Sequence, residues 1–173
     1  RGRVRTDRLS KYFSITRGTK QGDPLSSLLF NAFLEQIFRR LKPTWTKNKW
    51  GMQLGVTDES RITNLRFADD VFLVAKTKPQ LISMLKDVQC ASLQCGLELH
   101  PDKTKILSNT TRKFGKGKAT TADINGLEVE ILPGEKTVKY LGVLFAGRSE
   151  QKIELEHRAR AAWASFQKYK HEL

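Results

Sequence analysis

The chain has 173 residues, 39% of them hydrophobic, which is enough for one domain with a sizeable core. Its 31 lysines and arginines outweigh 18 acids, and a net charge of +13 favours a polyanionic partner such as nucleic acid. The charge would also fit an acidic membrane surface, but no signal peptide, lipidation motif or apolar run of about 18 residues is present, so we expect no membrane partner.

The first predicted element is a strand within residues 1–14, which leads into a polar loop with the sequence Arg17-Gly-Thr-Lys-Gln-Gly22. Glycines let the backbone approach a ligand closely, and the cations Arg17 and Lys20 add positive charge. Such a loop, placed before a helix, is suited to phosphates or a nucleotide.

A helix is predicted to follow the loop. Asp23 is a good N-cap, Pro24 suits the first helical position, and Pro43 should end the helix near residue 41. The positions expected on its buried stripe have a 3.6-residue period and are Leu25, Leu28, Leu29, Ala32, Phe33, Ile37 and Leu41.

Residues 42–60 are predicted as a basic connector with one short strand. Trp45 and Trp50 lie in it among lysines. Tryptophans in this setting either cap a core or stack on nucleic-acid bases, and we favour the first role because tryptophan is usually well buried.

Two adjacent carboxylates occur in Phe67-Ala68-Asp69-Asp70, between segments rich in β-branched and aromatic residues. We expect strands over 61–67 and 71–75, with the acid pair at the turn of a hairpin. The two carboxylates repel each other, and a divalent cation relieves that repulsion. Their hard oxygen atoms suit Mg²⁺. A solvated turn is the alternative for an isolated pair.

A second helix is predicted over 79–95, with Gly96 as its stop. Its buried stripe should contain Leu81, Leu85, Val88 and Cys95. Lys86 and Asp87 should face solvent. The spacing of Cys90 and Cys95 is not that of zinc or redox motifs, which predicts two reduced cysteines in the core and therefore an intracellular protein.

Short strands and turns are predicted for most of the remaining chain. The segment 97–107 should be a turn and a strand, 110–121 a polar basic loop, and Asn125-Gly126 the turn of a hairpin between 120–124 and 127–132. A strand over 137–145 and a helix from residue 149 to the end should follow. The apolar stripe of this helix contains Leu155, Ala159, Ala162, Phe166 and Tyr169.

Four segments together resemble a known family. Gln21-Gly22-Asp23-Pro24-Leu25-Ser26, followed 46 residues after Asp23 by Phe67-Ala68-Asp69-Asp70, resembles motifs B and C of reverse transcriptases, in the form typical of non-LTR retrotransposons. Segments 96–105 and 138–145 resemble motif D and motif E, the primer grip. Four motifs in order over about 130 residues are far more specific than one.

The resemblance implies an α+β fold, in which the antiparallel palm sheet of a right-hand polymerase is backed by the helices at 24–41 and 79–95. Residues 1–148 would form a partial palm with motifs B to E. Residues 149–173 would start the thumb, since the C-terminal helix leads into it.

The implied activity is that of an RNA-directed DNA polymerase, which extends a primer 3′ end by two-metal nucleotidyl transfer. Its partners would be an RNA template, a DNA primer and deoxynucleoside triphosphates. Its cofactor would be two Mg²⁺ ions, with Mn²⁺ as an alternative.

The resemblance also assigns roles to residues. Asp69 and Asp70 are the expected catalytic metal ligands, and Lys103 is the expected catalytic lysine near the nucleotide phosphates, with Lys105 in reserve. The expected nucleotide and template residues are Arg17, Gly18, Lys20, Gln21, Gly22 and Phe67. The expected primer grip is Tyr140, Leu141 and Gly142.

A third metal carboxylate, on motif A, belongs to the family pattern upstream of motif B. No residue before Arg17 fits it, because Asp7 lies in a basic, non-apolar segment. We therefore expect the fingers and motif A to be missing parts of the same polypeptide, and negligible polymerisation by this chain alone. The alternative is a non-catalytic nucleic-acid-binding relic of a retroelement. The family alone suggests a nuclear location.

Overall fold

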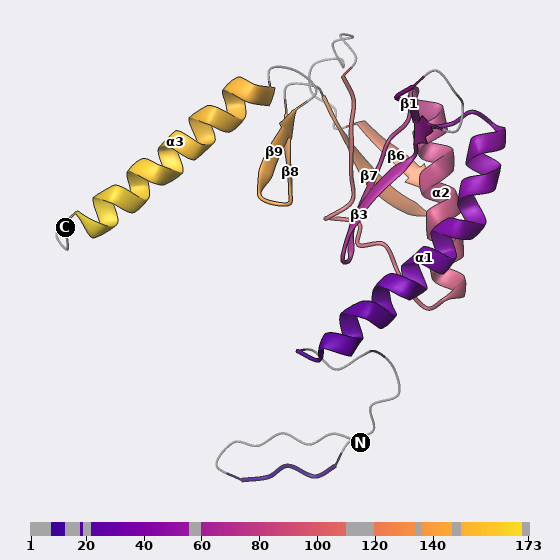
Figure 1. Cartoon of the computed structure of the whole chain (residues 1–173), viewed down its shortest axis with the longest axis horizontal. Coiled ribbons are helices and arrows are strands. Elements are labelled where there is room, and N and C mark those ends of the chain that lie inside the picture. Colours follow the sequence, from indigo (N-terminus) through magenta and orange to yellow (C-terminus); the bar gives the residue numbers. More distant parts are fainter. Residues whose placement is uncertain are drawn as a thin grey trace.

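The computed structural model describes residues 8–12, 18, 22–55, 60–109, 120–133, 136–146 and 150–170. Helices and short strands are mixed along this part of the chain, as the α+β prediction requires (Figure 1). The elements are α1 (Pro24–Lys47), β1 (Met52–Gln53), β2 (Arg61–Ile62), β3 (Asn64–Phe67), β4 (Asp70–Leu73), α2 (Lys78–Gln94), β5 (Lys105–Leu107), β6 (Thr120–Ile124), β7 (Leu127–Leu132), β8 (Thr137–Tyr140), β9 (Val143–Ala146) and α3 (Glu150–Tyr169). None of the described helices is both long and apolar enough to cross a bilayer.

Helix α1 begins as predicted but is longer. The Asp23 side chain accepts a hydrogen bond from the Leu25 N–H at 2.9 Å, and Pro24 is the first helical residue. The helix does not end before Pro43, so that prediction was wrong. Burial of Trp45, which has no exposed surface, fixes the last turns against the core and outweighs the backbone hydrogen bond that proline cannot donate.

The buried stripe of α1 also differs from the prediction. Its buried residues are Leu34, Ile37, Phe38 and Trp45, in the middle and C-terminal half. Leu25, Leu28, Leu29 and Phe33 are exposed. Figure 1 shows the N-terminal half of α1 extending beyond the sheets, so the described strands do not cover these side chains.

Helix α2 follows the prediction closely. Its ends lie at the Thr77 N-cap and the Cys95 C-cap, and Gly96 has a positive φ of +77° just beyond. Two expectations about its side chains were wrong. Asp87 accepts a hydrogen bond from Trp45 Nε1 at 2.8 Å instead of facing solvent. Cys90 and Cys95 are free thiols, as predicted, but both are exposed rather than in the core.

The described strands form four small sheets rather than one continuous antiparallel sheet. Three are antiparallel pairs, β1–β2, β3–β4 and β8–β9, and the fourth has the order β5-β7-β6. Strand β5 pairs with β7 in parallel, whereas β6 and β7 form the antiparallel hairpin that Asn125-Gly126 predicted. The described strands therefore do not form the single antiparallel sheet that was expected.

The predicted strand over 137–145 is in fact a hairpin. Strands β8 and β9 are antiparallel, and Tyr140 pairs with Val143 across a two-residue turn. Leu141 and Gly142 in this turn have φ values of +49° and +81°. Left-handed conformations at both positions reverse the chain, which an uninterrupted strand cannot do.

Two hydrophobic clusters hold the elements together. One lies between α2 and the β5-β7-β6 sheet and contains Leu85, Ile106, Ala122, Ile124, Val129 and Ile131. The other lies between α1 and α2 and contains Phe38, Trp45, Met84 and Val88. Leu73 of β4 packs against both clusters. Strand β4, which begins at Asp70, is therefore anchored to the whole core.

Helix α3 contacts β9 and otherwise projects away from the described body of the chain (Figure 1). The Leu144 N–H donates to Glu154 Oε2 at 2.8 Å, and Arg158 Nε lies 2.6 Å from Glu154 Oε1. The bond from Leu144, followed by Arg158, lowers the pKa of Glu154. The apolar residues Leu155, Phe166 and Tyr169 are exposed. One carboxylate thus fixes the start of α3 to the β8–β9 hairpin.

Candidate active site

The acid pair lies at the end of the β3–β4 hairpin, as predicted. Phe67 pairs with Asp70, and the two-residue turn consists of Ala68 and Asp69. Ala68 has a φ of +51°, a left-handed conformation that is unfavourable by about 1 kcal/mol for an L-residue. Such strain is often found at functional sites. Asp69 belongs to the turn, whereas Asp70 is the first residue of β4.

Strand pairing separates the two faces of this hairpin. Residues that face each other across an antiparallel pair share a side, and side chains alternate along each strand. Asp70 and Phe72 therefore share one face with Phe67 and Leu65. The other face carries Arg66 and its partner Val71, which packs on the cluster between α1 and α2.

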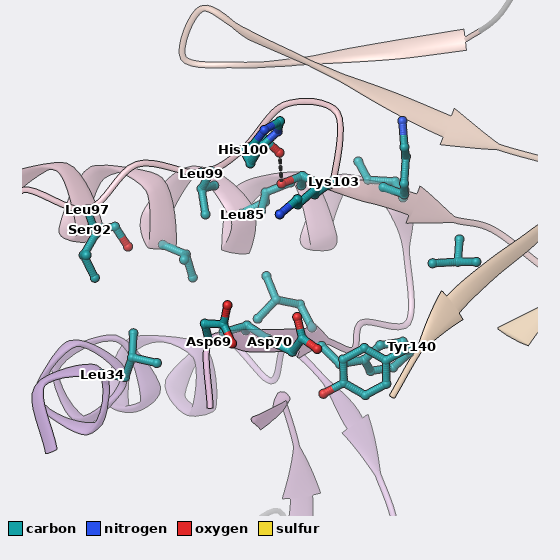
Figure 2. A pocket seen from close by; sticks show the side chains of 18 of the residues that line it. Leu34, Asp69, Asp70, Leu85, Ser92, Leu97, Leu99, His100, Lys103 and Tyr140 are labelled. Carbon is teal, nitrogen blue, oxygen red and sulfur yellow. Dashed lines mark hydrogen bonds between the residues drawn. The ribbon is translucent and has the colours of Figure 1, made fainter. Parts of the chain in front are cut away.

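Both carboxylates line an open cleft of about 480 Å³. Figure 2 shows Asp69 and Asp70 on one wall and Lys103 on the facing wall. The cleft is also bordered by α1, α2 and the β8–β9 hairpin, through residues that include Leu34, Ser92 and Tyr140. Segments far apart in the sequence thus bring two carboxylates and an ammonium group to one cavity.

The turn before β5 holds Lys103 in place. The Thr104 backbone N–H and its hydroxyl both donate to the His100 carbonyl oxygen, at 3.0 Å and 2.8 Å. Lys103 itself forms no ion pair with any described residue. Its charge is therefore available to a ligand in the cleft.

Lys105 also lines the cleft but has a partner. Its Nζ atom lies 2.9 Å from Glu130 Oε2 on the paired strand β7. The hydrogen bond from Lys105 is the main cause of the lowered pKa of Glu130. The Lys105 ammonium group is therefore paired with a carboxylate of the same sheet.

Tyr140 borders the cleft next to Asp70 (Figure 2). Its ring centroid lies 5.4 Å from that of Phe72 and 6.1 Å from that of Phe145. Burial raises the pKa of the Tyr140 phenol above 10, and the negative charge of Asp70 raises it further. Leu141 and Gly142 form the exposed tip of the same hairpin.

The predicted nucleotide and template residues are only partly described. Gly18 and Gly22 have φ values of +87° and +86°, in the left-handed region that favours glycine. Arg17, Lys20 and Gln21 lie outside the described residues. Phe67 is 65% exposed beside the turn and does not line the cleft.

Sequence reasoning did not single out Glu98 or His100, which also border the cleft. Both lie in the motif D-like segment, whose resemblance was the available signal. In the described part of the chain, no three His, Cys, Asp or Glu residues cluster closely enough to hold a metal ion together.

The donor set of Asp69 and Asp70 fits a hard divalent cation. Adjacent carboxylates on a solvent-accessible cleft supply oxygen ligands, and Mg²⁺ typically takes one or two protein carboxylates and leaves other positions to water and phosphates. Mn²⁺ accepts the same ligands.

Several known proteins are similar in sequence to this chain. The reverse transcriptase (RNA-dependent DNA polymerase) family matches residues 3–145. The retrovirus-related Pol polyprotein from the type-1 retrotransposable element R2 of Nasonia vitripennis is 32% identical over 133 residues, which cover 75% of this chain and 12% of that protein. The corresponding R2 protein of Popillia japonica is 33% identical over 136 residues, which cover 76% and 21%.

The Pol polyprotein from the type-2 retrotransposable element R2DM of Drosophila melanogaster is 33% identical over 141 residues, which cover 79% of this chain and 12% of that protein. The chain thus spans between 12% and 21% of the length of these relatives. The family match extends over most of the chain and includes all four motifs, so the predicted family is confirmed. The chain belongs to the reverse transcriptase (RNA-dependent DNA polymerase) family.

Proposed function

We propose that this chain provides the palm of an RNA-directed DNA polymerase, with the palm in residues 1–148 and the start of the thumb in residues 149–173. The observation that carries the proposal is the cleft in which Asp69 and Asp70 face Lys103. Its substrates would be an RNA template, a DNA primer and deoxynucleoside triphosphates.

Asp69 and Asp70 would hold the divalent metal ions. When bound, Mg²⁺ or Mn²⁺ would activate the primer hydroxyl and neutralise charge on the reacting phosphates. The two residues reach the cleft from different backbone positions, since Asp69 lies in the turn and Asp70 begins β4. The anchoring of β4 through Leu73 limits their movement.

Lys103 would act on the triphosphate from the facing wall. An ammonium group that has no ion-pair partner among the described residues can neutralise phosphate oxygens, and it can donate a proton to the pyrophosphate leaving group. Lys105 is a weaker candidate, because its ion pair with Glu130 would have to break.

The β8–β9 hairpin would position the primer end. Tyr140 packs on Phe72 within two residues of Asp70, so a strand held at this hairpin would lie close to the acid pair. Leu141 and Gly142 would contact the primer through the backbone at the hairpin tip. Arg17, Gly18, Lys20, Gln21 and Gly22 would contact nucleotide and template, with Phe67 at the edge of the site.

Binding of a fluorescent deoxynucleoside triphosphate, titrated with Mg²⁺, tests the proposal on the chain itself. The Asp69→Asn/Asp70→Asn variant should lose the Mg²⁺-dependent part of the binding. The control is Asp102→Asn, which removes one negative charge from a side chain that is 90% exposed and does not line the cleft. Binding that ignores both Mg²⁺ and the acid pair would instead favour the non-catalytic nucleic-acid-binding relic.

A further inference from the structure

A second groove, of about 700 Å³, lies outside the catalytic cleft. One wall is the C-terminal half of α1 and the other is formed by β2 and β3. Phe38 of α1 borders both cavities, and Asp69 and Asp70 do not border the groove. The groove is therefore separate from the acid pair.

The groove is basic. Four cationic side chains line it, Arg39, Lys42, Arg61 and Arg66, against one carboxylate, Glu35. The total charge of the chain is also strongly positive. A concave surface with this excess of cations attracts polyanions and concentrates them locally.

Arg66 already neutralises the charge of the Glu35 carboxylate. Arg66 Nη2 lies 2.6 Å from Glu35 Oε2, and this bond is the main cause of the lowered pKa of Glu35. The Arg66 guanidinium also lies over the Phe38 ring, 4.8 Å from its centroid. Arg61 is buried and donates to the Lys49 carbonyl at 3.0 Å. Glu35, Arg61 and Arg66 thus form a fixed, positively charged floor.

Arg39 and Lys42 form the accessible rim. They lie three residues apart on α1, and Thr46 follows one turn later, so all three share one helix face. The Arg39 side chain is 79% exposed, and its Nε atom is 3.7 Å from Glu35, at the long end of an ion pair. Exposed ion pairs of this kind are weak, so a phosphate can displace this contact.

Neutral hydrogen-bonding groups lie between the cations. Thr46, Thr63 and Asn64 line the groove, and Asn64 Nδ2 donates to Thr63 Oγ1 at 2.9 Å. This bond orients the Asn64 amide, whose oxygen can accept a hydrogen bond from a ribose 2′-hydroxyl. The 2′-hydroxyl is the group by which proteins distinguish RNA from DNA.

We propose that this basic groove binds the sugar-phosphate backbone of an RNA strand, at a site separate from the catalytic cleft. Arg39 and Lys42 contact phosphates, the Arg61 and Arg66 floor adds attraction, and Asn64 reads the ribose. RNA binding in the groove needs no metal ion, so it can be tested independently of the proposed polymerase function.

The test is fluorescence anisotropy of a short labelled single-stranded RNA with the full chain, in EDTA, over a range of salt concentrations. The double variant Arg39→Gln/Lys42→Gln removes the rim charges. The matched control Arg40→Gln/Lys47→Gln makes the same charge change on the same helix, at exposed positions that do not line the groove.

Loss of two phosphate contacts should weaken RNA binding about tenfold near physiological salt and reduce the slope of log K against log salt by about 1.4. The control should bind like the wild type. If the double variant fails to fold, as judged by circular dichroism, Lys42→Gln alone should weaken binding about fourfold.

Three results would overturn the proposal. Equal losses in the groove and control variants, or no loss in either, would show that the groove is not the binding site. DNA of the same sequence that binds as tightly as RNA, with the same loss in the groove variant, would refute the choice of RNA.

Discussion

Phe72 and Tyr140 pack with their ring centroids 5.4 Å apart and so connect the strand that begins at Asp70 to the β8–β9 hairpin. Phe145 completes the cluster, 5.8 Å from Phe72. The acid pair and the proposed primer grip therefore share one small aromatic core.

Substitution of Phe72 by alanine should disrupt this connection. Phe72 is half-buried, so we expect a loss of about 2 kcal/mol in the free energy of unfolding, below the range for fully buried phenylalanine. Urea denaturation measures the change. Phe67→Ala is the control, because this ring is 65% exposed on the same hairpin, and its effect should stay within about 0.5 kcal/mol. Equal losses in the two variants would contradict this role.

Tyr140 should make stability depend on pH in the alkaline range. Its folded pKa is raised, first by burial and then by Asp70, from an ordinary value of 10.0. Between these two pKa values the folded state binds more protons than the unfolded state, so stability is complete below pH 10 and falls as pH rises through the folded pKa.

Urea denaturation over this pH range, with Tyr140→Phe as the control, measures the effect. The phenylalanine variant should lose less stability above pH 10 than the wild type. If the two proteins have the same dependence of stability on pH, the prediction is wrong. Asp70→Asn should also lower the pKa of the phenol, as followed by the absorbance of tyrosinate.

Asp87 should stabilise the end of α1 through Trp45. Replacement by alanine leaves the buried indole N–H without its acceptor, which should destabilise the fold by about 1–3 kcal/mol in thermal unfolding. Asp87→Asn keeps an acceptor oxygen and should retain most of the stability. If asparagine and alanine are equally destabilising, the hydrogen bond is not the cause.

Lys103 and Lys105, two of the three lysines that line the cleft, should behave differently. Lys103→Gln should weaken Mg²⁺-dependent nucleotide binding and leave the unfolding midpoint unchanged, because this side chain has no partner among the described residues. Lys105→Gln should lower the midpoint instead, since it breaks the bond to Glu130. Competition binding and urea denaturation measure the two effects. If Lys105→Gln weakens nucleotide binding and Lys103→Gln does not, Lys105 is the nucleotide ligand.

Features set by neighbouring residues were predictable from the sequence. The Asp23 cap, the Asn125-Gly126 turn and the hairpin around Asp69 each depend on a few adjacent residues. The motif pattern also predicted that Lys103 belongs with the acid pair, and both border one cleft.

Features set by distant contacts were not predictable. The continuation of α1 past Pro43 depends on Trp45 and Asp87, which are 42 residues apart in sequence. Parallel pairing of β5 with β7 is equally non-local. The β8–β9 turn was missed because Leu141 is a poor residue for a left-handed conformation, although Gly142 was an available signal.

The central claim is that Asp69 and Asp70 hold divalent cations in the cleft. Mn²⁺ binding, measured from the electron paramagnetic resonance signal of the free ion, tests it most directly. The account predicts that the wild type and Asp102→Asn bind Mn²⁺ equally and that Asp69→Asn/Asp70→Asn loses this binding. Undiminished binding in the acid-pair variant would contradict the claim.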